Sequence, residues 1–221
     1  MSAATRKTRK RTRTKRSDGR PAARREPAAA EAAVAFSLGG NVGAVRGRLV
    51  EALLALEAFL APGGGPVPAA HRLAVSPLFR TAPVSDLPQP DYLNAAAAGW
   101  TTRGPHEVLA FGQELERRAG RRPGGPRNAP RPLDVDLLVH GVAVVDSPTL
   151  TLPHPRLAER AFVLVPLAAV APELPVPPDG ATVAELLARL PRPLAGVERV
   201  PWGAAAARRL GLDHEAERDR A

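Results

Sequence analysis

Residues 127–138 read RNAPRPLDVDLL and join a cationic loop to an alternating run of apolar and acidic residues. Alternation with a period of two is typical of a strand that buries one face. On such a strand Asp134 and Asp136 point to one side, while their leucine and valine neighbours point into the core. Mg²⁺ binds readily to one or two carboxylates together with phosphate oxygens, so the pair is a candidate metal site. A bare Asp-x-Asp more often marks a solvated acidic face, and its surroundings decide between the two interpretations.

The loop before this strand is rich in glycine, proline and arginine. Its basic side chains are Arg121, Arg122, Arg127 and Arg131. A cationic loop beside two metal-binding carboxylates is what a polyphosphate site needs, because guanidinium groups pair with phosphate oxygens in a bidentate manner. The surroundings therefore favour a phosphate-binding site over a solvated face.

Apolar runs on both sides of this strand predict an α+β fold. The expected strands are 33–38, 72–80 with an irregularity at Pro77, 92–102, 133–139 and the short 142–145. The expected helices are 45–60, 105–118, 163–170 and 183–190. The order βαββαβ is that of a ferredoxin-like sandwich, an antiparallel sheet with helices on one face.

The charge of the chain is concentrated at its N-terminus. The 221 residues carry a formal net charge of +9, and residues 1–30 hold eleven basic side chains against two acidic ones. Residues 31–221 are balanced, with 20 side chains of each sign. Like charges without apolar partners predict a disordered tail. Such a tail could bind nucleic acid, but we favour a solvated extension or a start site placed too far upstream.

We divide the chain into a disordered basic tail (1–32), a folded domain (33–190) and a C-terminal extension (191–221) whose order the composition does not predict. The chain has no cysteine, which excludes disulfides, a thiol nucleophile and Cys-ligated metal sites. The tail lacks the apolar segment of a secretory signal, and no stretch is apolar enough to span a membrane. We therefore expect a cytoplasmic protein, and we expect it to be a monomer.

Two further segments carry polar residues suited to phosphate. Residues 152–162 read LPHPRLAERAF, in which His154 and Arg160 could both reach a phosphate, although a lone histidine is more often a structural hydrogen-bonding residue. Residues 37–43 read SLGGNVG and could cradle phosphate, but they lack the Gly-Lys-Ser/Thr ending of a P-loop. A tight turn into a helix explains the second segment equally well.

Residues 79–84 (FRTAPV) and 89–94 (QPDYLN) suggest a slot for a flat heterocycle. Tyr92 is the only tyrosine of the chain and lies close in sequence to Asn94, which offers an aromatic face beside an amide edge. Ordinary loop packing is the alternative interpretation.

Taken together and in this order, these segments resemble the family of 6-hydroxymethyl-7,8-dihydropterin pyrophosphokinases (HPPK). The likeness runs from about Val34 to about Pro178, and its most specific part is the pattern Arg-x-x-Pro-Arg-x-x-Asp-x-Asp that begins at Arg127. The resemblance implies the ferredoxin-like fold and a Mg²⁺-dependent diphosphotransferase of folate biosynthesis. Such an enzyme uses two Mg²⁺ ions to transfer pyrophosphate from ATP to the hydroxymethyl group of a reduced pterin, which releases AMP.

The resemblance also implies roles for individual residues. The metal ligands would be Asp134 and Asp136, which form the catalytic group with Arg121 and Arg131. The ATP-binding residues would be Glu116, Arg121, Arg131, Leu137 through its backbone, Thr151, His154 and, at the reacting end, Arg160. The pterin-binding residues would be Tyr92 and Phe162 on the two ring faces, Asn94 at the polar edge, and the backbone of Thr81, Ala82 and Val84.

Three positions depart from the family pattern. Asn128 stands where some members have a tryptophan, Pro123 replaces a basic residue, and Pro155 replaces an aromatic residue beside the histidine. All three bear on the contacts of the loop 120–130, a candidate lid whose closure or product release would limit turnover.

A second hypothesis is a ferredoxin-like nucleic-acid-binding module with a basic N-terminal arm. The neutral body and the aromatic content of only 4% oppose it.

Overall fold

The structure of the chain is a computed structural model that describes residues 31–62, 67–85, 87–121, 129–192, 194 and 196–212. The expected basic tail therefore lies outside the described residues except for its last two positions. The same holds for residues 122–128, which include Arg122 and Arg127 and the departures at Pro123 and Asn128.

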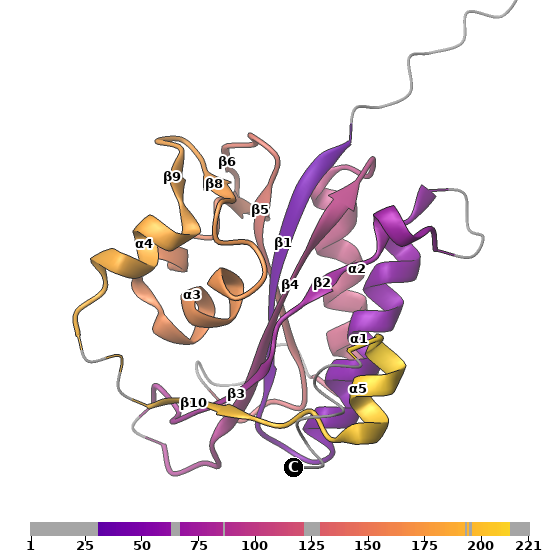
Figure 1. Cartoon of the computed structure of the whole chain (residues 1–221), viewed down its shortest axis with the longest axis vertical. Coiled ribbons are helices and arrows are strands. Elements are labelled where there is room, and N and C mark those ends of the chain that lie inside the picture. Colours follow the sequence, from indigo (N-terminus) through magenta and orange to yellow (C-terminus); the bar gives the residue numbers. More distant parts are fainter. Residues whose placement is uncertain are drawn as a thin grey trace, which may run out of the picture.

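An antiparallel sheet is the centre of the fold (Figure 1). Its strands lie in the order β10-β3-β4-β1-β5, and the short β2 pairs with β4. The bounds are β1 Ala32–Gly40, β2 Ala74–Val75, β3 Leu78–Thr81, β4 Tyr92–Thr101, β5 Asp134–His140 and β10 Val197–Val200. Two small hairpins flank the sheet and are formed by β6 Val145–Asp146 with β7 Thr151–Leu152 and by β8 Pro175–Val176 with β9 Ala181–Thr182.

Helices cover both faces of this sheet, so the expectation of helices on one face alone is wrong. One face carries α1 Val45–Leu60, α2 Pro105–Arg118 and α5 Ala204–Leu210, and the other carries α3 Ala161–Ala168 and α4 Val183–Arg189. The reason lies in the central strands, which are buried on both sides. In β1, Phe36 and Leu38 pack toward α1, whereas Ala35 packs toward α3. Among the described residues no helix is long and apolar enough to cross a membrane.

Most of the expected elements are confirmed, including both long helices at their predicted ends. The strand expected at 72–80 is divided into β2 and β3 by Ser76 and Pro77. The Ser76 backbone N–H still donates to the Ala96 oxygen at 2.9 Å, and the Ser76 Oγ accepts the backbone N–H of Ala96 at 2.9 Å, so backbone and side chain together hold this interruption to β4. The short strand expected at 142–145 begins only at Val145, because Gly141 turns the chain with a φ of +53°.

The C-terminal segment, whose order the sequence left open, adds an edge strand and a helix. Strand β10 pairs with β3, and α5 packs against α1. Trp202 lies between these two elements with none of its surface exposed, and its indole N–H donates to the backbone oxygen of Ser76 at 3.0 Å. One buried aromatic side chain thus fixes the end of the chain to the interruption between β2 and β3.

Replacing Trp202 by alanine is expected to lower the free energy of unfolding by about 3–5 kcal/mol, because the change opens a large cavity in the core. Denaturant unfolding followed by circular dichroism measures the effect. Trp100 is the matched control, since 51% of its surface is exposed, and Trp100→Ala should change stability by no more than about 0.5 kcal/mol. Equal losses in the two variants would contradict the anchoring role of Trp202.

Candidate active site

A cavity of about 850 Å³ lies on the α3 side of the sheet. Its floor is formed by Ser37 and Gly39 of β1, Thr81 of β3, Tyr92 and Asn94 of β4, Asp134 and Asp136 of β5, and Val197 of β10. Its wall is formed by the segment from His154 to Phe162, which includes the 3₁₀ turn η3 Leu157–Glu159, and by the loop after β3. Each of the strands β10, β3, β4, β1 and β5 therefore contributes to one cavity.

The cavity brings together most of the residues that the sequence predicted. Those that line it are Thr81, Ala82, Val84, Tyr92, Asn94, Arg121, Arg131, Asp134, Asp136, His154, Arg160 and Phe162. Three others do not line it. Leu137 is buried in the core, Thr151 is exposed on β7, and Glu116 lies behind the cavity on α2.

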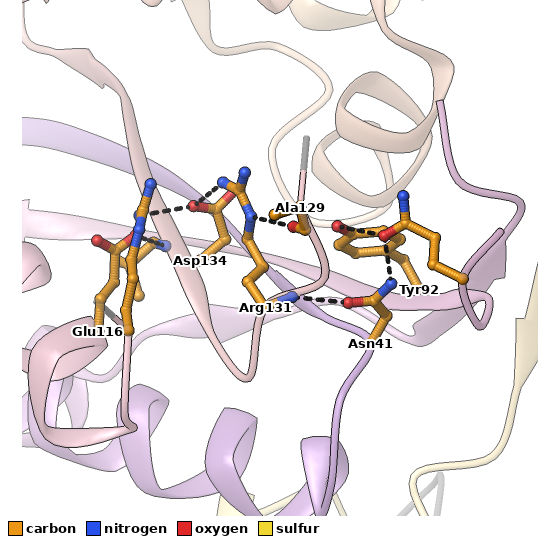
Figure 2. Close-up of polar contacts among 9 residues, drawn as sticks. Asn41, Tyr92, Glu116, Ala129, Arg131 and Asp134 are labelled. Atoms are coloured by element: carbon orange, nitrogen blue, oxygen red, sulfur yellow. Dashed lines mark hydrogen bonds and ion pairs between the residues drawn. The ribbon is translucent and has the colours of Figure 1, made fainter. Parts of the chain in front are cut away.

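The acidic pair has the orientation that the alternation predicts. Asp134 and Asp136 face the cavity, while Val135 and Leu137 are buried on the opposite face. The Oδ1 atom of Asp134 accepts Nη1–H groups from Arg121 at 2.9 Å and from Arg131 at 2.8 Å (Figure 2). Burial raises the pKa of Asp136 to about 6, and the charge of Asp134 adds to this rise, whereas the cavity arginines oppose it. Two carboxyl groups and two guanidinium groups therefore meet at this end of the cavity.

Glu116 holds this arrangement from behind. Its Oε1 accepts the backbone N–H of Val135 at 2.9 Å and forms an ion pair with Arg121. Because β5 is an edge strand, this N–H has no neighbouring strand to pair with, and the buried carboxylate takes that place. Burial raises the pKa of Glu116 to about 7, and the hydrogen bond from Val135 opposes the rise. Glu116 thus links α2, the strand with the acidic pair and one cavity arginine.

Asn41 is a positioning residue that the sequence did not single out by itself. Its Nδ2 donates to Gln89 Oε1 at 2.8 Å and to the Pro90 oxygen at 3.0 Å. Its Oδ1 accepts the backbone N–H of Arg131 at 2.9 Å (Figure 2). One amide therefore ties three segments to each other: the end of β1, the loop before β4 and the loop before β5. The Gly-Gly-Asn sequence is the available signal, but the two interpretations of residues 37–43, a phosphate cradle and a tight turn, do not predict the contacts of the Asn41 side chain.

The two glycines before Asn41 allow close backbone approach. A Cβ atom on Gly39 would lie 2.5 Å from Asn94 Oδ1, and one on Gly40 would lie 2.7 Å from the backbone oxygen of Pro132. Such distances are too short for real contacts. The glycines therefore let the segments around the cavity pack directly against β1, which agrees with the tight-turn interpretation of residues 37–43.

The end of the cavity toward β3 is suited to a flat, polar ring. Asn94 and Thr81 are both buried, and Asn94 Nδ2 donates to Thr81 Oγ1 at 2.8 Å. Tyr92 is half-buried, and its burial raises the pKa of the phenol. Phe162 begins the helix on the opposite wall, and the Arg160 guanidinium carbon lies 5.2 Å from its ring centroid. An amide edge and two aromatic rings are thus available in one place.

The opposite wall carries positive charge, including one arginine that the sequence analysis missed. His154 is fixed to β5 because its backbone N–H donates to the Leu138 oxygen at 2.9 Å. Burial lowers the pKa of His154, and the charges of Arg160 and Arg156 lower it further. Arg156 also lines the cavity and its backbone N–H donates to His154 Nδ1 at 3.2 Å. This wall offers cations to an anionic ligand.

Gly40→Ala is expected to lower the free energy of unfolding by about 1–3 kcal/mol, because the added methyl group would overlap the backbone oxygen of Pro132. Denaturant unfolding is the measurement. Gly47 of α1 is the matched control because a Cβ there meets no atom within 4 Å. Gly47→Ala should leave stability unchanged or raise it by up to about 1 kcal/mol. A stable Gly40→Ala variant would show that the two segments do not need this close approach.

Comparisons with known proteins agree with this geometry. Residues 35–172 match the family model described as 7,8-dihydro-6-hydroxymethylpterin-pyrophosphokinase (HPPK). The 2-amino-4-hydroxy-6-hydroxymethyldihydropteridine pyrophosphokinase of Pseudomonas aeruginosa is 38% identical over 168 residues, which cover 76% of this chain and 96% of that protein. The protein of the same name from Methylorubrum extorquens is 39% identical over 165 residues, with coverages of 75% and 96%.

Longer proteins are also similar. The mitochondrial folate synthesis bifunctional protein of Arabidopsis thaliana is 42% identical over 134 residues, and the match covers 61% of this chain but only 22% of that protein. The crystal structure of Plasmodium falciparum HPPK-DHPS with pteroate has a TM-score of 0.52 at 13% identity, covering 72% of this chain and 42% of that one. The likeness to the solved structure concerns the fold.

Proposed function

The chain belongs to the 7,8-dihydro-6-hydroxymethylpterin-pyrophosphokinase family, and we propose that it is a pyrophosphokinase of folate biosynthesis. It transfers the pyrophosphoryl group of ATP to the hydroxymethyl oxygen of 6-hydroxymethyl-7,8-dihydropterin, so that AMP and the pterin diphosphate are formed. The observation that carries the proposal is that the two ends of the cavity differ in the chemical groups that line them. A slot for a flat ring and an acidic pair surrounded by arginines occupy opposite ends of one space.

The register of the sheet supports the placement of both substrates. Asn94 lies opposite Gly39, and Gly39 lies opposite Asp134, so two strand spacings separate the amide from the carboxylate. Neighbouring strands lie about 4.8 Å apart, which gives a separation of about 10 Å between the two backbones. A pterin ring held by Asn94 would therefore extend its hydroxymethyl group toward a triphosphate held beside Asp134. Holding the reactants in line supplies a large part of the rate enhancement in phosphoryl transfer.

The acidic pair fits the two Mg²⁺ ions that the family implies. The described residues contain no group of three or more His, Cys, Asp or Glu side chains arranged for a metal ion. Two carboxylates on one face are nevertheless a suitable donor set, because Mg²⁺ keeps waters and takes further oxygens from a nucleotide. Asp134 and Asp136 would hold the ions. Bound there, Mg²⁺ neutralises phosphate charge and acts as a Lewis acid toward the transferred group.

The chain's own side chains then bind the rest of the nucleotide. Arg121 and Arg131 share Asp134 and are free to turn their remaining N–H groups toward phosphate oxygens. His154 and Arg160 would contact the triphosphate from the opposite wall. Glu116 would support the site by fixing Arg121 and β5 rather than by touching ATP, whereas Thr151 and the Leu137 backbone would border the adenine outside the cavity described above.

We also propose that the core of the domain has the ferredoxin-like fold. The strands β3-β4-β1-β5 follow the spatial order of a ferredoxin-like sheet, and α1 and α2 pack on one of its faces. We assign this core to the ferredoxin-like class and treat α3 and α4 as an additional layer.

Family membership supports the enzyme and does not support the nucleic-acid-binding module. We further propose that the enzyme is cytoplasmic and monomeric.

Asp134→Ala and Asp136→Ala should each reduce AMP formation from ATP and the dihydropterin by at least about a hundredfold. Each variant lacks a carboxylate ligand of the Mg²⁺ that would neutralise charge in the transition state. The assay follows AMP release with and without Mg²⁺, and circular dichroism confirms the fold. Asp146→Ala is the control, since Asp146 is exposed on β6 and should retain full activity. Full activity in either acidic-pair variant would refute the metal assignment.

Arg131→Ala and Tyr92→Ala should affect different kinetic constants. Loss of the Arg131 guanidinium should reduce kcat by about a hundredfold, because it removes charge stabilisation at the phosphates. Loss of the Tyr92 ring should instead raise the KM for the pterin, with a smaller effect on the KM for ATP. Steady-state kinetics with each substrate varied in turn make the distinction. An Arg131→Ala variant altered only in its pterin KM would contradict the phosphate role.

A further inference from the structure

The C-terminal strand contributes to the cavity although it lies beyond the residues that the family model matches. The family match ends at residue 172, whereas β10 begins at Val197. Val197 and the preceding Gly196 both line the cavity. The end of the cavity at the β10 edge of the sheet is therefore lined by a segment that follows the family-model match.

The sheet register determines which end this is. Val197 lies opposite Thr81, and Thr81 lies opposite Tyr92 on the next strand. Thr81 also accepts the hydrogen bond from Asn94. The acidic pair lies on β5, at the other edge of the sheet and four strand spacings away, or about 19 Å. Val197 is consequently next to the flat-ring slot and far from the phosphate-binding end.

Two interactions hold Val197 in this position. Its neighbour Glu198 accepts hydrogen bonds from the Arg80 guanidinium, with Nη2 to Oε1 and Oε2 at 3.0 and 2.9 Å and Nε to Oε2 at 3.2 Å. At the end of the strand, the buried Trp202 is bound to the Ser76 oxygen at 3.0 Å. Both contacts follow Val197 in the chain and oppose a slip of register, and a slip by one residue would turn Val197 away from the cavity.

We propose that Val197 is a specificity-determining residue that forms the end wall of the pterin subsite. The inference rests on the proposed function and extends it to the size of the heterocycle. A branched apolar side chain at this point would pack against the edge of a bicyclic pterin and limit what can be attached to it. The backbone beside Thr81 would supply the polar contacts, and Val197 would supply the shape.

The test enlarges this side chain. Val197→Phe should raise the KM for the dihydropterin by about tenfold or more, because the phenylalanine ring would enter the subsite. The Kd of the dihydropterin, measured by calorimetry, should rise by a similar factor. The KM for ATP, and kcat at saturating pterin, should stay within about twofold. Val197→Ile should show the same selective effect to a smaller degree. Val142→Phe is the matched control, because Val142 is 91% exposed and does not line the cavity.

The outcomes separate the inference from the function on which it rests. If the wild-type chain releases no AMP with the dihydropterin, the proposed function fails. If the wild type is active and a folded Val197→Phe variant keeps the wild-type pterin KM and Kd, the inference is overturned. Equal rises in the KM for ATP and for the pterin would also overturn it. If Val197→Phe shows no cooperative unfolding, and so is not folded, the Val197→Ile variant provides the test. An unchanged pterin KM in Val197→Ile then refutes the end-wall role.

Discussion

The site depends on the absence of a side chain at Gly39. This residue lies opposite Asn94 on one neighbouring strand and opposite Asp134 on the other. A Cβ atom there would lie 2.5 Å from the Asn94 side chain. Because nothing projects from β1 between them, an amide and a carboxylate on the flanking strands open onto the same cavity. The antiparallel register then fixes the order of the remaining groups, with the ring-binding residues toward β3 and the charges toward β5.

The charged side chains of the cavity form a network in which one residue contacts several others, rather than isolated ion pairs. Asp134 lies between two guanidinium groups, and one of these groups also contacts the buried Glu116. Buried carboxylates without such partners would become neutral, because burial disfavours the charged form. The network places two guanidinium groups on Asp134 beside Asp136, whose own pKa burial raises. Family membership explains why this arrangement exists, and the contacts explain how a neutral protein body maintains it.

Local pattern was sufficient for the parts of the site that lie on regular elements. The orientation of Asp134 and Asp136 followed from the period of a strand, and the two long helices ended where proline, glycine or the loss of periodicity indicated. The functions of Glu116 and Asn41 could not be predicted in this way, because their partners lie 19 to 90 residues away in sequence. The second helical layer escaped prediction for a related reason. Alanine-rich strands such as β4 give little sign that both faces are buried.

Both ends of the cavity lie at edges of the sheet, and the two edges are stabilised differently. On β5, the outward N–H of Val135 is bound by Glu116 and the outward oxygen of Leu138 by the His154 backbone. These partners belong to the end of the cavity proposed to bind phosphate, so the edge and the candidate site support each other. On β10, the stabilising contacts are the exposed Arg80–Glu198 pair and the remote Trp202. Exposed ion pairs contribute at most about 1 kcal/mol, so the buried indole is the stronger of these two side-chain contacts. Loss of that packing would therefore disturb β10 and the Val197 end of the cavity before it disturbed the β5 end.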